Sequence, residues 1–434
     1  MQHRSDDADV IVVGAGPAGS STAHWCASAG LDVLLLEKAE FPRDKICGDG
    51  LTPRAVAELA RMGVATDERD GWIRNRGLRV HASGRSWELD WPDLASFPAY
   101  GMAHARKTLD HKLAQHAQAS GAKLHTRTKV TGAVTDERTG RVAGVTAQPL
   151  DGAGRPDGPQ RTFRAPVVVA SDGVSSRLAT GVGRLRRDDR PMGTAVRGYY
   201  RTPLHADPFM ESHLELWAGE PGRSALLPGY GWVFPLGDGT ANVGLGSVHS
   251  TPARQSAAGI DYRSLQDTWL SNSAPAGSEL SPEAAVGRVR GAALPMGFNR
   301  GPLYDAGLLL AGDAAGMVSP FNGEGIAYGL QAGRVAADAI VTSRQKRSDD
   351  AREAALEQYT ERMRGDLGGY YTLGRYFVRL IEQPQVMRAC VKYGLPRKVV
   401  MQFVLKFLSD CYEPNGGDWI DRTIALLTKV VPRS

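Results

Sequence analysis

A short apolar strand that breaks into a glycine-rich turn constrains this chain more than any other feature. Residues 10–13 read Val-Ile-Val-Val, long enough for a buried parallel strand, and a helix-compatible segment, residues 20–30, follows the turn. Gly14 lets the chain leave the strand sharply, Gly16 leaves room for a phosphate, and Gly19 lets helix and strand pack closely. The helix N-terminus adds unpaired N–H groups and partial positive charge. We therefore predict a dinucleotide phosphate site at Gly14, Ala15, Gly16, Pro17, Ala18 and Gly19.

An acid follows the second apolar segment at the place where such a site needs one. Residues 32–36 read as a strand, and Glu37 comes 23 residues after Gly14. This is close to the usual spacing of about 20 residues for a carboxylate that accepts ribose hydroxyls. Such a carboxylate repels a 2′-phosphate, so NADP is disfavoured although Lys38 lies beside it, and NAD and FAD stay open.

Composition places the chain among ordinary globular proteins. Its 434 residues are 42% hydrophobic and 23% charged, which suits two or three domains with ample core. No apolar window approaches the roughly 20 residues of a membrane-spanning helix, and the acidic residues before the first strand argue against a secretory signal. The cysteines form neither a CxxC pair nor a disulfide framework, so we expect a cytoplasmic protein and predict no metal site. They are Cys26, Cys47, Cys390 and Cys411.

The positive charge gathers near the C-terminus. Residues 341–434 hold sixteen Lys and Arg against eleven Asp and Glu, which accounts for the whole net charge of +5. Residues 375–406 hold seven basic side chains, one acid and many apolar residues. A basic, apolar-rich helical segment is a candidate for peripheral contact with the inner face of the cell membrane, and a helical cap with a solvated basic face is the alternative. No nucleic-acid partner is expected, because no recognition motif accompanies the charge.

The pattern along the chain changes twice. Strands alternate with helices at first, whereas residues 192–247 read as short strands joined by Gly and Pro turns, which is typical of an antiparallel sheet. From residue 350 the chain reads as helical, with breaks at Gly368-Gly369, Pro384 and Pro396.

Only one complete GxGxxG occurs, so a separate nicotinamide domain is not expected and a tightly held flavin is favoured.

Two further elements follow apolar strands: Asp172-Gly173, and Gly312-Asp313 with Gly-Glu-Gly-Ile downstream. Together with the glycine turn they resemble the three FAD signatures of the aromatic-hydroxylase type of flavoprotein. The resemblance implies that Asp313 accepts from ribityl hydroxyls, that Asp172 shapes a turn, and that Arg106 reaches the phosphate or ribose region. An exposed arginine paired with Asp110 is the alternative for Arg106. The resemblance also assigns Val130, Gly312, Gly323, Gly325 and Ile326 to the cofactor site.

Two motifs indicate one family within that superfamily. Pro42 to Gly50 resembles the Pro-x-x-Lys-x-Cys-Gly-x-Gly loop of geranylgeranyl reductases, and Tyr230 to Pro235 resembles their Tyr-x-Trp-x-Phe-Pro strand. Within that family the chain is most similar to the bacterial menaquinone reductases, which saturate an isoprene double bond of the quinone tail. The resemblance places Cys47, Gly48, Asp49 and Gly50 at the flavin, and Tyr230, Trp232 and Phe234 at the substrate.

The implied reaction is hydride transfer from reduced FAD to one alkene carbon, with a proton reaching the other. Shape must orient the substrate, and burying a C20 chain is worth about 16 kcal/mol gross at ~0.8 kcal/mol per carbon. Cys47 and Tyr230 are the candidate catalytic groups, and packing in a tight loop or in the core is the alternative for each. The implied partners are a polyprenyl or isoprenoid quinone and an unidentified electron donor: NAD(P)H, a ferredoxin or a quinol.

The predicted fold is mixed α/β: a Rossmann-like FAD-binding domain of the aromatic-hydroxylase type, an antiparallel-sheet substrate domain and a C-terminal helical region. A flavin monooxygenase shares the three FAD signatures. A flavin halogenase shares part of residues 229–235, and a non-catalytic isoprenoid or flavin carrier is the third alternative. The predicted ranges are 8–72, 104–185 and 291–345 for the FAD-binding domain, 73–103 and 186–290 for the substrate domain, and 346–434 for the cap.

Overall fold

Apolar runs buried on both faces build the first sheet. The computed structural model describes residues 7–46, 48–275, 277–394 and 397–433, and within them four sheets form. All four residues of the first strand are buried, as a parallel sheet covered by helices requires. The strand order is β18-β19-β12-β1-β2-β8, parallel except for the β18–β19 pair. These strands are β1 (Val10–Val13), β2 (Val33–Leu36), β8 (Lys123–His125), β12 (Val167–Ala170), β18 (Tyr304–Asp305) and β19 (Leu308–Leu310).

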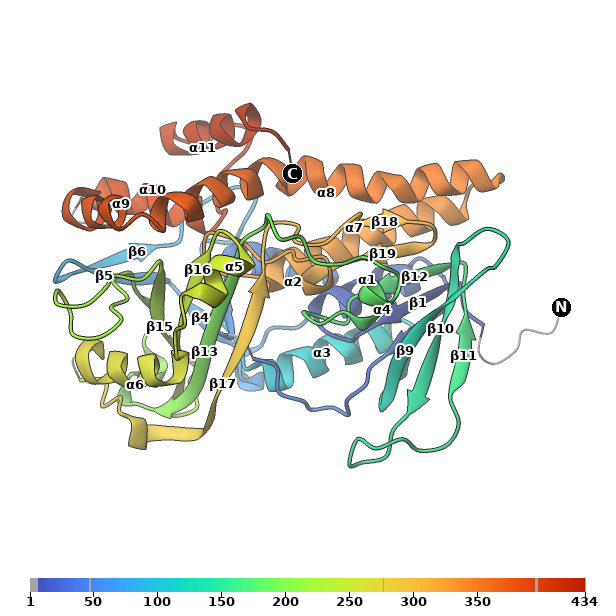
Figure 1. Cartoon of the computed structure of the whole chain (residues 1–434), viewed down its shortest axis with the longest axis horizontal. Helices are drawn as coiled ribbons and strands as arrows, with labels where there is room; N and C mark the ends of the chain where they lie inside the picture. The colour runs from blue at the N-terminus through green and yellow to red at the C-terminus, as the bar shows by residue number, and fades with distance from the viewer. Residues whose placement is uncertain (1–6, 47, 276, 395–396, 434) are drawn as a thin grey trace.

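Small residues let two helices of this region pack almost backbone to backbone. A Cβ atom on Gly333 would lie 2.6 Å from the carbonyl oxygen of Ala18, so α7 and α1 approach at a point where no side chain fits. Figure 1 shows α7 beneath the long helix α8. The helices of this region are α1 (Pro17–Ser28), α2 (Pro53–Met62), α3 (Arg106–Ala119), α4 (Arg177–Gly181) and α7 (Ile326–Arg344).

Two further sheets are small and antiparallel. Between two strands of the outer sheet lies the exposed loop 151–160, as its Gly and Pro content predicts. The outer sheet comprises β9 (Thr128–Thr135), β10 (Val142–Pro149) and β11 (Arg161–Arg164), and the inner one β3 (Gly50–Leu51), β4 (Ile73–Asn75) and β7 (Gly101–Ala103).

The second large sheet has the order β17-β13-β16-β15-β14-β5-β6, and its pairs are antiparallel except β14 with β5. Its strand β17 runs across residue 291, where the sequence suggests a domain boundary, and pairs with β13 along most of its length. The strands are β5 (Gly77–Ala82), β6 (Arg85–Asp90), β13 (Met192–Arg201), β14 (Phe209–His213), β15 (Gly229–Pro235), β16 (Thr240–His249) and β17 (Ala285–Pro295). Helices α5 (Pro252–Ala257) and α6 (Tyr262–Ser273) accompany them.

The C-terminal region is helical, but its first helix does not break where the sequence predicts. Helix α8 (Asp349–Ile381) runs unbroken through Gly368 and Gly369. A Cβ atom on Gly369 would lie 2.0 Å from the carbonyl oxygen of Thr428, so this glycine permits the close approach of helix α11. Pro384 does mark a break, because it starts a new helix, and Pro396 lies outside the described residues. The other helices are α9 (Pro384–Ala389), α10 (Lys398–Leu408) and α11 (Trp419–Val430), with a π-turn at Cys390–Gly394.

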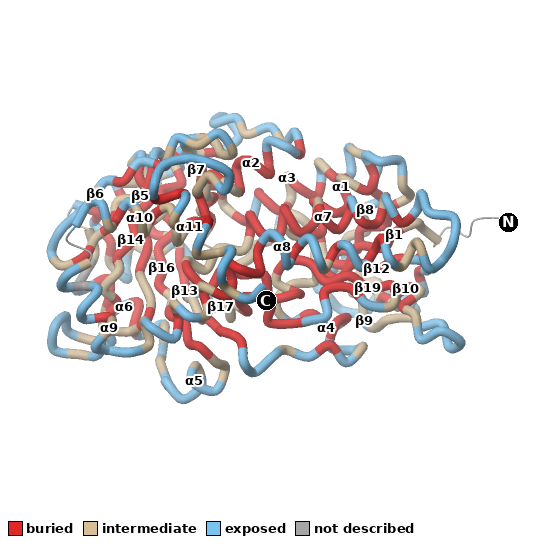
Figure 2. Tube along the Cα trace, turned by 90° about the horizontal axis from the view of Figure 1, so that it is seen from above, coloured by how far each residue is buried: buried red, intermediate tan, exposed pale blue. Residues whose placement is uncertain are grey.

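The buried segments run through both large sheets, whereas the outer faces of the C-terminal helices are exposed (Figure 2). In the described part of the chain, no helix has the length and apolar character to cross a bilayer.

Candidate active site

One cavity of about 1400 Å³ joins the glycine turn to the C-terminal helices. The turn lines it with Gly14, Gly16, Pro17 and Ala18. The end where the sequence predicts the ribose, called the ribose end below, is lined by Glu37, Lys38, Arg106 and Val130. Its middle is lined by Gly48, Gly50, Asp172, Gly312 and Asp313, and by Gly323, Gly325 and Ile326 at the start of α7. Tyr230, Trp232 and Phe234 line the far part. Ala15, Gly19 and Asp49 lie behind this wall, and Cys47 lies outside the described residues.

The glycine turn has the shape that its spacing predicts. Gly14 has φ +97°, and a Cβ atom on Gly19 would lie 1.8 Å from the carbonyl oxygen of Gly14. A Cβ atom on Gly16 would meet only Asp110 Oδ2, at 4.0 Å, so open space lies beside this backbone. A pyrophosphate fits such a cradle, at the N-terminus of α1.

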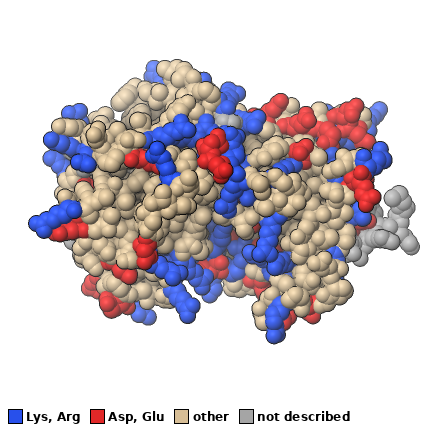
Figure 3. Space-filling view, viewed as in Figure 1, with Lys and Arg blue, Asp and Glu red and all other residues tan. Residues whose placement is uncertain are grey.

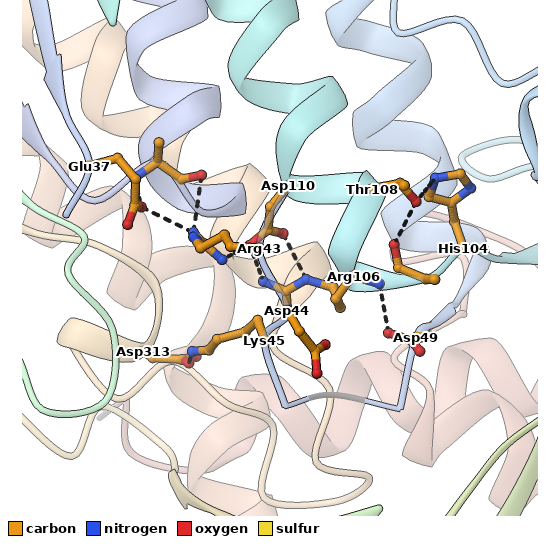
Figure 4. Close-up of polar contacts among 12 residues, drawn as sticks. Glu37, Arg43, Asp44, Lys45, Asp49, His104, Arg106, Thr108, Asp110 and Asp313 are labelled. Carbon is orange, nitrogen blue, oxygen red and sulfur yellow. Dashed lines mark hydrogen bonds and ion pairs between the residues drawn. The ribbon is translucent and has the colours of Figure 1, made fainter. Parts of the chain in front are cut away.

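A chain of alternating charges closes the ribose end. Glu37 accepts hydrogen bonds from the backbone N–H of Ala15, at 3.0 Å, and from Arg43 Nη2, at 3.1 Å. Arg43 Nη1 donates to Asp110 Oδ2 at 2.7 Å, and Asp110 also accepts two bonds from Arg106, at 2.7 and 2.8 Å (Figure 4). Arg106 is therefore buried against Asp110, and Arg43 is the cation that faces Glu37.

Asp110 holds two guanidinium groups together. Burial raises the pKa of this carboxyl, but Arg106 and Arg43 outweigh burial and hold the pKa below its usual range. Arg43 lies in the loop that resembles the geranylgeranyl reductases, six residues after Glu37. Its position in that loop is the sequence feature that could have identified Arg43 as a residue of the site.

Asp49 anchors the loop before β3 and is wholly buried. Its carboxylate accepts from the backbone N–H of Arg106 at 2.9 Å, from Tyr199 Oη at 2.9 Å and from Asn242 Nδ2 at 2.7 Å. Its φ of +63° is a conformation that Asp tolerates better than most residues. Asp49 therefore connects this loop to α3 and to the large sheet from behind the cavity wall.

Three further acids fix the loops around the middle of the cavity. Asp313 Oδ2 accepts from Lys45 Nζ at 3.3 Å, and Asp44 pairs with Arg197 at 2.7 Å. Asp172 accepts from Ser176 Oγ at 2.6 Å, which supports the predicted turn before α4. Asp313 and Lys45 point toward each other across the cavity edge, as Figure 4 shows.

The far part of the cavity is apolar. Tyr230, Trp232 and Phe234 alternate along β15 and so share one face of the sheet. Tyr230 Oη donates to the carbonyl oxygen of Asn322 at 2.6 Å, and Trp232 Nε1 donates to Asn242 Oδ1 at 2.9 Å. Opposite them α10 contributes Met401, Phe403, Val404, Leu405, Phe407 and Leu408.

A partly buried acid lies where the polar and apolar parts meet. Glu324 precedes α7 and lines the cavity, and its Oε1 accepts from Thr52 Oγ1 at 2.8 Å. Among the residues that the structure describes, its Oε2 is buried without a hydrogen-bond partner. Burial raises the pKa of Glu324 to about 7, against the opposing effects of Thr52 and Arg54.

A second polar cluster lies at the β14–β5 pair. His81, Glu211 and His213 bring their ligand atoms within 4.8 Å of one another. The two imidazole rings are stacked, 4.3 Å apart and 13° from parallel, so their in-plane nitrogen lone pairs do not converge on one point. Arg79 Nη1 also donates to Glu211 at 2.9 Å. This geometry fits charge pairing better than metal coordination.

Comparison with known proteins gives a consistent result. Residues 7–365 match the family described as FAD binding domain. The chain is 37% identical to menaquinone reductase of Mycobacterium tuberculosis over 423 residues, 96% of this chain and 94% of the relative. It is 31% identical to digeranylgeranylglycerophospholipid reductase 1 of Methanopyrus kandleri, over 86% of this chain and 91% of the relative.

Solved structures show the same fold at lower identity. A geranylgeranyl bacteriochlorophyll reductase-like protein from Thermoplasma acidophilum superimposes with a TM-score of 0.74 at 21% identity, covering 97% of this chain and 99% of that one. A flavin-dependent brominase gives a TM-score of 0.69 at 20% identity, covering 98% of each chain. At such identities the likeness concerns the fold alone. The sequence relatives at 37% and 31% identity are both reductases, and the chain belongs to the geranylgeranyl reductase family of FAD-dependent oxidoreductases.

Proposed function

We propose that this enzyme saturates an isoprene double bond of a polyprenyl substrate, with the menaquinone side chain or a geranylgeranyl lipid as the preferred class. The observation that carries the proposal is the continuity of the cavity from the glycine turn to the apolar wall of β15 and α10. The names of the relatives with 37% and 31% identity support the same substrate class.

The residues present suit FAD at one end of this cavity. The turn at Gly14 to Gly19 would hold the pyrophosphate, Glu37 would accept from the ribose, and Asp313 would accept from the ribityl chain. When bound, FAD supplies a two-electron centre that can deliver a hydride to carbon. Gly323, Gly325 and Ile326 would present backbone N–H groups and a helix N-terminus to the ring.

The apolar part of the cavity would orient the alkene by shape. Trp232 and Phe234 form one wall, and the side chains of α10 form the other, so a flexible isoprene chain is held away from water. Tyr230, through its bond to Asn322, fixes the distance between β15 and the loop before α7. Binding energy from the tail can thus position the reacting bond.

The test is an anaerobic turnover. The purified holoenzyme is reduced with dithionite and mixed with menaquinone or geranylgeranyl diphosphate. The mass of the product is then measured by mass spectrometry. A gain of two hydrogens in the prenyl tail, located by fragmentation after the quinone ring is reoxidised in air, supports the proposal, and a gain of oxygen in air would instead indicate a monooxygenase. Flavin that no polyprenyl substrate reoxidises would indicate a carrier. Replacing dithionite in turn by NADH, NADPH, a reduced ferredoxin or a quinol identifies the donor.

We also propose that the C-terminal helices contact the membrane that holds the substrate. Basic side chains gather over α9 and α10, whereas acidic ones gather over the first part of α8 (Figure 3). Exposed apolar residues accompany the basic region: Leu380, Tyr393, Val399, Trp419, Leu426 and Val430. This combination suits an anionic lipid surface.

Liposome sedimentation tests this contact. Arg397 and Lys398 are exposed, whereas Lys406 is already neutralised by Asp418 and Asp421, each at 2.9 Å. Replacing Arg397 and Lys398 by Gln should weaken binding to anionic vesicles severalfold, and replacing Lys406 should matter less. Equal binding by the double variant and the wild type would contradict the contact.

A further inference from the structure

Glu324 is an acid at the border between the cofactor end and the apolar end of the cavity. On one side Thr52 Oγ1 donates to its Oε1 at 2.8 Å, and Thr52 follows the loop whose Gly50 lies against Phe234. On the other side Asn322, two residues earlier, accepts the hydroxyl of Tyr230 at 2.6 Å. Glu324 is therefore tied to two segments that both contact β15, the wall of the substrate channel that carries Trp232 and Phe234.

We infer that Glu324 is the catalytic acid that donates the proton to the second alkene carbon. The inference rests on the proposed function and deepens it. The supporting geometry is that Glu324 lines the cavity and that its Oε2 has no hydrogen-bond partner among the described residues. Oε2 is buried in the ligand-free cavity, so the carboxyl group must rotate to present its proton to the alkene carbon.

One alkene carbon receives a hydride whose electron pair comes from the reduced cofactor, and a C–H bond forms there as the cofactor is oxidised. The second carbon takes the Glu324 proton through the former π electron pair, so an O–H bond breaks, a C–H bond forms and a carboxylate is left. Solvent returns a proton to the carboxylate. Two electrons from the cellular donor, which is NAD(P)H, a ferredoxin or a quinol, or from dithionite in the test, restore the cofactor.

The surroundings favour the protonated form of this carboxyl by raising its pKa. Arg54 of α2 is the cation that acts on it, yet the guanidinium is engaged by Asp410, at 2.8 Å, after α10. One guanidinium, that of Arg54, thus interacts with two buried carboxyl groups, those of Asp410 and Glu324. One of the two carboxyl groups therefore tends to be protonated. The other titratable groups of this cluster are Tyr328 of α7, Tyr370 and Tyr371 of α8, and Cys411.

Tyr230 is the competing donor within the described residues. Its hydroxyl proton is directed at the backbone carbonyl of Asn322, and the bond is short. A phenol in that arrangement must break a structural hydrogen bond before it can protonate substrate. Rotation of the Glu324 carboxyl gives up the bond from Thr52 Oγ1, a contact between two side chains, and leaves the backbone in place, which is why the geometry favours the acid over the phenol.

Three variants test the assignment in single-turnover experiments with dithionite-reduced holoenzyme. Glu324→Gln keeps the shape and the acceptor for Thr52 but has no acidic proton, and reoxidation by polyprenyl substrate should fall at least a hundredfold. Glu324→Asp keeps an acid and should recover at least a tenth of the wild-type rate. Reoxidation by ferricyanide, which takes electrons without protonating carbon, should stay within twofold in both variants.

Two readouts separate a proton donor from a structural residue. The wild-type rate should fall as pH rises through about 7, and Glu324→Gln should lose that dependence. Asp410→Asn releases Arg54 toward Glu324, so the falling limb should move to lower pH. An infrared band of a protonated carboxylic acid should titrate over the same range in the apoprotein and be absent in Glu324→Gln.

The outcomes are distinguishable. If the wild type does not reduce any polyprenyl substrate, the proposed function fails and Glu324 has no alkene to protonate. If the wild type turns over and Glu324→Gln does so within threefold with the same pH profile, the function stands and the assignment of Glu324 is overturned.

Discussion

Gly369 of α8 and Thr428 of α11 lie so close that a Cβ atom on the glycine would sit 2.0 Å from the carbonyl oxygen of the threonine. Gly365, one turn earlier on the same helix, has no atom within 4 Å of the corresponding position. Gly369→Ala should therefore push α11 away and lower the free energy of unfolding by roughly 2 kcal/mol or more. Gly365→Ala should raise it by about 1 kcal/mol, because alanine favours a helix. Chemical denaturation measures both, and equal effects of the two changes would contradict this packing.

Asp110→Asn should loosen the ribose end of the cofactor site. The change leaves the guanidinium groups of Arg43 and Arg106 without their shared carboxylate, and breaking a buried pair from one side costs about 3 kcal/mol or more. We expect a lower melting temperature and less FAD per chain after purification. The control is Asp67→Asn, which breaks an exposed pair with Arg69 and should change stability by less than about 0.5 kcal/mol.

Val404→Phe should shorten the substrate channel. Val404 lines the cavity from α10, whereas Val399 of the same helix is exposed. A larger side chain at Val404 should raise KM for a long polyprenyl substrate about tenfold, equivalent to ~1.4 kcal/mol, and spare a short prenyl substrate. Val399→Phe serves as the matched control. Equal KM values for long chains in both variants would show that the chain does not pass along α10.

Glu324→Gln should stabilise the protein in alkali while it impairs turnover. Burial raises the folded-state pKa of Glu324 to about 7, so the folded state keeps a proton that the unfolded chain releases above about pH 4.3. The wild-type free energy of unfolding therefore falls as pH rises from about 4.3 to about 7. Glutamine has no such proton, and the variant should exceed the wild type by about 2 kcal/mol at pH 8, with a smaller difference at pH 5. Urea titrations at the two pH values measure the difference.

Gly19→Ala should abolish cofactor retention. The added Cβ atom would lie 1.8 Å from the carbonyl oxygen of Gly14, so the turn and α1 cannot keep their positions. We expect a colourless protein that FAD does not reconstitute. Gly181→Ala, with nothing within 4 Å, is the control and should bind flavin normally.

The cofactor-binding fold is well predicted because its signals are local. Gly14, Gly16 and Gly19 specify a turn within six residues, and the strand before them is buried on both faces. The substrate sheet is harder to predict at its edge. Strand β17 is mostly exposed or half-buried and shows no regular alternation of buried and exposed residues, so only its pairing with β13 identifies it.

Contacts between residues that are distant in sequence could not be predicted from local patterns. Arg43 and Asp110 are 67 positions apart in the sequence, and no local sequence pattern predicts their ion pair. Asp49 looks like a cofactor contact in its motif, yet its partners Tyr199 and Asn242 come from another sheet. The glycines of α8 predict a break by helix propensity, a cost of about 1 kcal/mol each, which packing against α11 can offset.

Strand β5 pairs with β14 in the second large sheet, although in the sequence it comes between β2 and β8 of the first sheet. The strands of the two large sheets are therefore interleaved along the chain. Residues 77–90 leave the ribosome long before residues 209–213 are synthesised. Strands β5 and β6 therefore have an unpaired sheet edge during synthesis. A piece cut at residues 186–290 would lack β5, β6 and the end of β17. Neither sheet can be transplanted into another protein as one uninterrupted fragment.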